Sequence, residues 1–229
     1  MGHQGLLVPA ASASPLVVGS AKNTSSTSSS ATTSTSINCA VGDVIYVCVG
    51  AQSSSSSTPT ISSSISETYT AILTGTGNQD TWNPAPTFGT EKLFVARAVV
   101  GTAGSRTFTV NDTGAGFPSL CVVVYRNVVH ESITAVSGHD SATTFDSPSI
   151  TTNNNSGWLV FFIMSGQNAN PTYGMSGATI DVAQQDNSLW TCAIAHKAFS
   201  GTTTDHAAFT TAQSPCDAIV AACVARQAP

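Results

Sequence analysis

The stretch GDVIYVCVG, Gly42 to Gly50, carries the strongest structural signal in this sequence. Successive side chains of a strand point to opposite faces, so its inner residues divide into two sets, Val44, Tyr46 and Cys48 on one face and Ile45, Val47 and Val49 on the other. Both faces are apolar, which predicts a central strand that is covered on both sides. A second stretch, SGWLVFFIM (Ser156 to Met164), has the same character and predicts a second strand of this kind.

The rest of the chain also favours strands over helices. Val, Ile, Thr, Phe and Tyr, which are strand formers, dominate apolar segments that are short and bounded by Gly, Asn, Ser or Pro. RTFTV (Arg106 to Val110) alternates apolar and polar residues, which indicates a strand with one solvated face. We therefore predict an all-β fold: a jelly-roll-like β-sandwich of about ten strands, in two sheets that each draw strands from both halves of the chain.

The two halves of the sequence resemble each other in the order of their strands. Pairing Gly42 with Gly157 gives an offset of 115 residues, and pairing Leu93 with Leu189 gives 96. The pattern indicates either an internal duplication or the alternation that any two sandwich halves share. It leaves open two domain organisations, one sandwich over residues 33–229 or two small sandwiches over residues 33–135 and 140–229.

Residues 1–32 form an apolar N-terminal segment followed by a Ser/Thr-rich linker. The segment is too apolar to remain in solvent, so we expect it to lie as an extended arm on its own body or on a neighbouring molecule. Trp82, in a polar insert of the first half, is a further interface candidate, because tryptophan is enriched where proteins meet. The interface candidates are therefore Leu6, Leu7, Val8, Pro9, Leu16, Val17 and Trp82.

The charge content excludes several classes of partner. Charged residues make up 8% of the chain, against roughly 25% in an average globular protein, and the net charge is -5. The seven Lys and Arg residues are scattered, whereas nucleic-acid grooves and anionic membranes require clustered cations. No apolar run approaches the roughly 20 residues of a membrane span. The N-terminus lacks the pattern of a signal peptide, so we expect synthesis and assembly in the cytoplasm.

Six cysteines are present, and none belongs to a C-x-x-C pair, which argues against zinc ribbons and thioredoxin-type redox sites. Four of them lie inside apolar runs, where we expect buried thiols. Cys39 and Cys216 flank strands instead and are the candidates for a disulfide.

The sequence contains no recognisable catalytic constellation. His196 follows apolar residues on one face of its strand and is expected to be a partly buried, hydrogen-bonded side chain. YGMSGA (Tyr173 to Ala178) lacks the final Gly of a nucleophile elbow. No carboxylate is expected in mid-strand on an apolar face, where a raised pKa would mark a catalytic acid. We therefore predict no enzyme activity, no cofactor and no bound metal.

Three stretches carry a family resemblance: AVGDVIYVCVG (Ala40 to Gly50), SGWLVFFIMSG (Ser156 to Gly166) and CDAIVAACVA (Cys216 to Ala225). They resemble the core patterns of a β-sandwich domain family of phage virion surface proteins. The resemblance implies a structural protein of the virion, most simply a capsid decoration or cement protein. Its partners would be the major capsid protein or other virion proteins and further copies of itself, for example in a trimer. The alternative function is a carbohydrate- or receptor-binding module of a tail fibre or secreted protein, in which loop side chains such as Trp82 and Tyr173 would hold a glycan.

Overall fold

The computed structural model describes residues 13–24, 29–53, 58–73, 90–112, 115–153, 155–166, 173–184, 190–211 and 216–229. Every regular element among them is a strand, and none of these residues forms a helix that could cross a membrane. The predicted all-β sandwich is confirmed, but it contains twenty strands instead of about ten.

The first half of the chain forms a large antiparallel sheet with the order β1-β10-β4-β7-β6. Its strands are β1 (Leu16–Thr24), β10 (Ala115–Arg126), β4 (Val44–Ser53), β7 (Thr90–Val99) and β6 (Thr70–Leu73). Two small sheets, with the orders β2-β9-β5 and β3-β8, cover one face of it. Their strands are β2 (Ser30–Thr32), β9 (Phe108–Asn111), β5 (Thr60–Ser63), β3 (Ile37–Cys39) and β8 (Gly104–Arg106).

The second half repeats this arrangement, with the orders β11-β20-β14-β17-β16, β12-β19-β15 and β13-β18. The large sheet consists of β11 (Val128–Ala142), β20 (Cys216–Gln227), β14 (Ser156–Gly166), β17 (Trp190–Ser200) and β16 (Thr179–Gln184). The small sheets consist of β12 (Thr144–Asp146), β19 (Ala208–Thr211), β15 (Tyr173–Ser176), β13 (Ile150–Thr151) and β18 (Thr204–Asp205). Adding ten to each strand number of the first half gives its counterpart in the second, so the two halves have the same topology.

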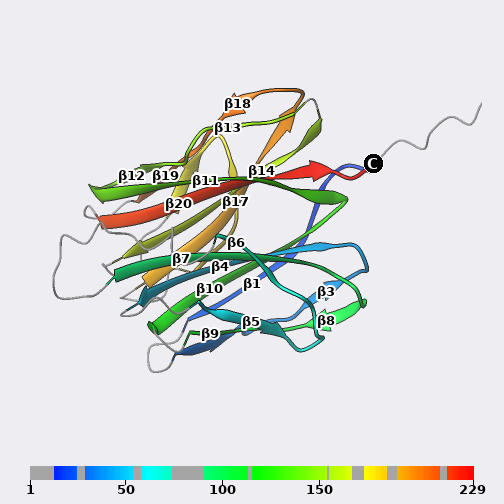
Figure 1. The fold of residues 1–229 in the computed structure, drawn as a ribbon, viewed down its shortest axis with the longest axis horizontal. Helices are drawn as coiled ribbons and strands as arrows, with labels where there is room; N and C mark the ends of the chain where they lie inside the picture. The colour runs from blue at the N-terminus through cyan, green and yellow to red at the C-terminus, as the bar shows by residue number, and fades with distance from the viewer. Residues whose placement is uncertain are drawn as a thin grey trace, which may run out of the picture.

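The sheets stack in four layers, with the two large sheets inside and the small sheets outside (Figure 1). Ile45, Val47 and Val49 of β4 pack into a core under the first small sheets. Val44, Tyr46 and Cys48 pack instead into the layer between the two large sheets, which we call the central layer. Strand β14 is likewise buried on both faces, so both predictions of a doubly covered central strand are confirmed.

The prediction that each sheet draws strands from both halves is wrong, because every sheet is built from one half only. The chain passes from the first half to the second at a single residue, Asn127, between β10 and β11. Asn127 has a φ of 61°, a left-handed conformation that asparagine tolerates better than most residues. The crossing therefore lies before residue 135, where the two-sandwich alternative placed the end of its first unit.

Equivalent hydrogen bonds fix the alignment of the two halves. The Thr33 hydroxyl accepts from the amide of Phe108 at 3.1 Å, and the Ser147 hydroxyl accepts from the amide of Ala207 at 3.1 Å. These pairs give offsets of 114 and 99 residues, in place of the predicted 115 and 96. The predicted offset of 115 differs from the observed offset of 114 by one residue. It is wrong because a shift of one residue exchanges the two faces of a strand. It would align Val44, which faces the central layer, with Leu159, which faces the outer core.

The halves are related by an approximate twofold axis through the central layer. Strand β1 lies against β16, and the equivalent pair, β6 and β11, also meets. Near the axis, Gly50 of β4 faces Met164 of β14, and these two positions are equivalent under the offset of 114. A Cβ atom on Gly50 would lie only 3.0 Å from the Met164 Cβ, so a glycine here allows the large sheets to approach closely.

Candidate functional site

The first described residues of the N-terminal arm are held at the junction between the halves. The side-chain amide of Asn127 donates to the Ser14 carbonyl at 2.9 Å, and that of Gln227 donates to the Ala13 carbonyl at 3.1 Å. The amide of Ala228 donates to the Asn127 carbonyl at 2.9 Å, which ties the C-terminus to the same place. Ala13 and Ser14 are therefore held beside the C-terminus.

Exposed apolar side chains gather at the same end of the molecule. The large apolar residues that the structure shows as exposed are Leu16, Val41, Val99 and Val129, with exposed fractions of 51%, 67%, 50% and 40%. The strand register brings their elements together: Leu16 lies opposite Arg126, Val44 lies opposite both Tyr125 and Val99, and Val129 lies opposite Arg226. We call these four residues, with Ala13 and Ser14, the arm end. In Figure 1 strand β1 begins at the right, beside the marked C-terminus.

Charged side chains around the arm end are paired. Arg126 donates from Nε and from a terminal nitrogen to the two carboxylate oxygens of Asp43, at 2.7 and 2.8 Å. The Asp43 carboxylate is almost fully buried and also accepts from the amide of Ala40 at 2.8 Å. Arg226 and Glu131 form a second ion pair at 3.1 Å. These pairs neutralise charge locally, so the arm end presents valine and leucine side chains on a rigid support.

A second cluster of functional side chains lies in the central layer near β16. Asp181 accepts a 2.6 Å hydrogen bond from the Tyr125 hydroxyl and lies 2.9 Å from His196 Nδ1. Because a carboxylate only accepts, Nδ1 is the donor. The His196 ring stacks on Trp158, with centroids 4.2 Å apart. Burial, followed by the charge of Asp181 and the hydrogen bond to it, raises the pKa of Tyr125 well above its ordinary value, which keeps its hydroxyl protonated.

This cluster is not a requirement of the fold. Val123 of β10 lies opposite Tyr46, and Cys223 of β20 lies opposite Val160, which is the equivalent of Tyr46 under the offset of 114. Val123 and Cys223 are therefore equivalent, which gives β10 and β20 an offset of 100. With this offset and those of 114 and 99, the equivalents of Tyr125, Trp158 and His196 in the other half are Ala225, Val44 and Arg97. Asp181 lies at the bulge of β16 and corresponds to Ile72 at the bulge of β6. The same topology therefore forms without a buried carboxylate at this position.

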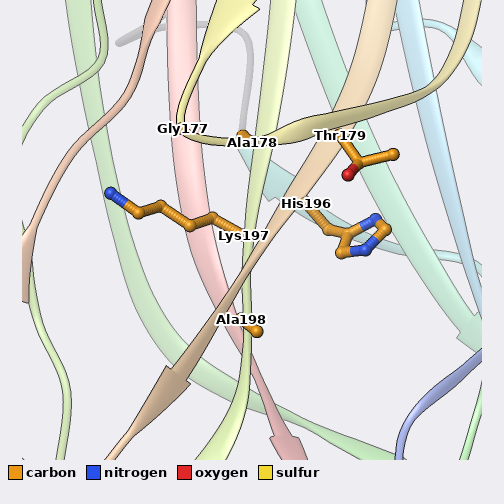
Figure 2. Close-up of a pocket in the computed structure, with 6 residues that line it drawn as sticks. All are labelled: Gly177, Ala178, Thr179, His196, Lys197 and Ala198. Atoms are coloured by element: carbon orange, nitrogen blue, oxygen red, sulfur yellow. The ribbon is translucent and has the colours of Figure 1, made fainter.

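A cavity of about 300 Å³ opens beside the histidine. It is lined by Gly177, Ala178, Thr179, His196, Lys197 and Ala198. Figure 2 shows the side chains of His196 and Lys197 pointing to opposite sides of β17. The Lys197 ammonium is paired with Asp205 at 2.7 Å, so it is directed away from the histidine. Within the described part of the chain no Ser or Cys side chain hydrogen-bonds to His196.

Three buried thiols form a further cluster in the central layer. Cys48 and Cys121 lie directly opposite each other on β4 and β10, and Cys192 of β17 faces them from the other large sheet. The Cys121 thiol donates to the Cys192 carbonyl at 3.2 Å, and the Cys192 thiol donates to the Cys48 carbonyl at 3.7 Å. Among the described residues no group of three His, Cys, Asp or Glu side chains has an arrangement that could hold a metal ion.

The residues predicted from sequence have varied outcomes. Leu6, Leu7, Val8, Pro9 and Trp82 lie outside the described residues. Leu16 belongs to the arm end, whereas Val17 is partly buried against the central layer. Cys39 is a free thiol buried in the first outer core, and the Cys216 side chain lies outside the described part. His196 is partly buried and hydrogen-bonded, as predicted.

One prediction about the acids is wrong. Asp181 does lie within a strand and packs against an apolar layer, where no carboxylate was expected. The bulge between Ile180 and Val182 turns its side chain toward Tyr125 and His196. Simple alternation along TIDVAQ (Thr179–Gln184) gives no sign of this bulge, so the pairing of Asp181 with His196 could not be predicted.

Compared with known proteins, the chain matches no family model, no curated protein and no solved structure.

Proposed function

We propose that this chain is a non-enzymatic structural protein of a virus particle that attaches to the shell through its N-terminal arm and the arm end. The observation that carries the proposal is the coincidence of the two features at one place. The body fixes the arm at Ala13 and Ser14, and four exposed apolar side chains lie at the same end of the large sheets. An apolar patch beside an apolar chain segment is the usual composition of a protein–protein contact.

The architecture supports a structural role. The three stacked cores of the four-layer body are built from buried hydrophobic side chains, and only 8% of the residues of the chain are charged. Few Lys and Arg residues leave few sites for trypsin-like proteases, which suits a protein displayed on a particle. The expected partner is the major shell protein, which would bind Leu6 to Pro9 together with Leu16, Val41, Val99 and Val129.

The test is attachment of an arm-deleted protein to particles that lack it. The deletion should remove residues 1–12 and keep Ala13 onward, because β1 begins at Leu16 and a longer cut would remove an edge strand of the large sheet. We expect this variant to keep its circular-dichroism spectrum and melting temperature and to lose attachment by at least about tenfold, equivalent to about 1.4 kcal/mol.

A second variant tests the arm end with the arm intact. Val99→Ser and Val129→Ser together keep the backbone and replace exposed side chains, so the effect on folding should lie within about 0.5 kcal/mol per site. Attachment should weaken again. The matched control is Thr204→Val, an exposed change on the small sheet β18, which should leave attachment unaltered. Full attachment of both the deletion and the double variant would refute the proposal.

A further inference from the structure

Three thiols of the central layer lie where the two halves meet. Cys48 and Cys121 belong to the first half and Cys192 to the second, and all three are fully buried. Cys192 contacts both of the others, since its carbonyl accepts from the Cys121 thiol at 3.2 Å and its own thiol donates to the Cys48 carbonyl at 3.7 Å. Cys192 is therefore the shared neighbour of two sulfurs from the opposite sheet.

The two large sheets approach each other closely beside the three cysteines. A Cβ atom placed on Gly50 would lie 3.5 Å from the Cys192 Cβ, and Gly50 follows Cys48 by two residues on the same face of β4. Disulfides require Cβ atoms about 3.5–4.5 Å apart, whereas packed sheets are usually about 10 Å apart between backbones. Gly50 therefore lets the large sheets approach closely beside the cysteine layer, and the Cys121 and Cys192 thiols each reach a backbone carbonyl of a cysteine in the opposite sheet, at 3.2 and 3.7 Å.

The fold does not require thiols at these positions. Under the offsets of 114, 100 and 99 residues, the equivalents of Cys48, Cys121 and Cys192 are Phe162, Ala221 and Leu93, all buried in the same central layer. Hydrophobic side chains thus fill the equivalent sites on the other side of the axis. The three positions carry thiols on one side of the axis and hydrophobic side chains on the other.

We propose that Cys192 and Cys121 form a disulfide between the two halves when the protein meets a peroxide, and that Cys48 replaces Cys121 in this bond when Cys121 is absent. The Cys192 thiolate attacks one peroxide oxygen, the O–O bond breaks, and Cys192 becomes a sulfenic acid. The Cys121 sulfur then attacks the Cys192 sulfur, the S–O bond breaks, and the departing hydroxide leaves as water with the thiol proton. Two thiols lose two electrons, and one hydrogen peroxide becomes two waters.

The surroundings favour Cys192 as the sulfur that reacts first. Burial disfavours the thiolate of Cys192, but the interactions with the Cys121 and Cys48 side chains and hydrogen bonds from backbone amides outweigh burial and lower the pKa of Cys192 to about 5. Burial raises the pKa of Cys48 and of Cys121 well above the ordinary value. Because all three sulfurs are inaccessible to solvent, the reaction should be slow and should speed up when the halves open.

The test exposes the folded, full-length protein to hydrogen peroxide and maps the products after the remaining thiols are alkylated. Trypsin separates the three cysteines, since Cys48, Cys121 and Cys192 fall in the fragments 23–92, 107–126 and 127–197. We expect fragment 107–126 to be linked to 127–197, with a loss of two hydrogen atoms from the intact mass. The bond closes a loop of about 70 residues and should raise the melting temperature by about 10 °C, reversibly with dithiothreitol.

Three variants make the outcome specific. Cys192→Ser should abolish the linkage, Cys121→Ser should link fragment 23–92 to 127–197, and Cys39→Ser, whose thiol lies in the outer core, should leave the linkage unchanged. Oxidation of the folded protein without a linked pair, or a linkage that persists in Cys192→Ser, would overturn the proposal.

Discussion

Replacing Gly50 with alanine tests the contact between the two large sheets directly. The added Cβ would lie 3.0 Å from the Met164 Cβ and 3.0 Å from the Thr191 carbonyl oxygen, both closer than ordinary van der Waals contact. Overpacking of this kind costs about 1–3 kcal/mol, and alanine recovers about 0.5–1 kcal/mol of backbone entropy relative to glycine. We therefore expect Gly50→Ala to lower the free energy of unfolding by about 1–2 kcal/mol, measured by urea denaturation.

The matched control is Gly101→Ala, the same chemical change in a turn, where the new Cβ would meet only the Glu67 carboxylate at an ordinary 3.6 Å. This variant should lie within about 0.5 kcal/mol of the parent. In a Met164→Gly background, which removes the facing Cβ, the cost of Gly50→Ala should fall by about 1 kcal/mol, since contacting residues are energetically coupled. Equal effects of Gly50→Ala and Gly101→Ala, or additivity with Met164→Gly, would refute the proposed approach of the sheets.

Three further predictions concern strand packing and pH. Gly157→Ala should destabilise the protein by about 3 kcal/mol or more in the same urea assay, because its Cβ would meet the backbone at the Ala225 carbonyl and, at 2.8 Å, the Arg226 Cα. Burial raises the pKa of Glu67, but hydrogen bonds from Arg106 and the Gly101 amide outweigh burial, so the pKa is lowered overall. The free energy of unfolding should therefore fall as pH drops below about 4.5. This fall should be smaller in Glu67→Gln. Burial, with a smaller effect of Arg97, lowers the pKa of His130 to about 4, so stability should decline between pH 6.5 and 4, where only the unfolded chain binds the proton. His130→Gln should flatten this part of a stability–pH curve, and an unchanged slope would contradict the assignment.

The sequence was most informative about the central strands. Two apolar faces on β4 and β14 required cover on both sides, and the structure provides it with a small sheet outside and a large sheet inside. Alternation does not reveal which layers provide that cover. A strand buried by its own half and a strand buried by the other half have the same pattern, so the assignment of sheets to halves could not be predicted.

The alignment of the halves failed for a similar reason. Gly42 and Gly157 look equivalent in sequence, but Gly42 lies in a turn with a φ of 88°, whereas Gly157 lies within β14 against the backbone of β20. Glycine occupies the two positions for different physical reasons. Pairing them shifted the alignment of the two halves by one residue and so assigned every side chain of the strand to the wrong face. The hydroxyl pair of Thr33 and Ser147 marks the correct alignment, but only hydrogen bonds in space show that these residues are equivalent.

The boundary between the halves has a consequence for how they stay together. In a dimer of separate chains, association weakens on dilution, and stability depends on protein concentration. Here one residue, Asn127, joins two bodies that meet like the subunits of such a dimer, so each half meets the other at an effective concentration that dilution does not change. The central layer therefore persists on dilution for as long as the chain is intact and both halves remain folded.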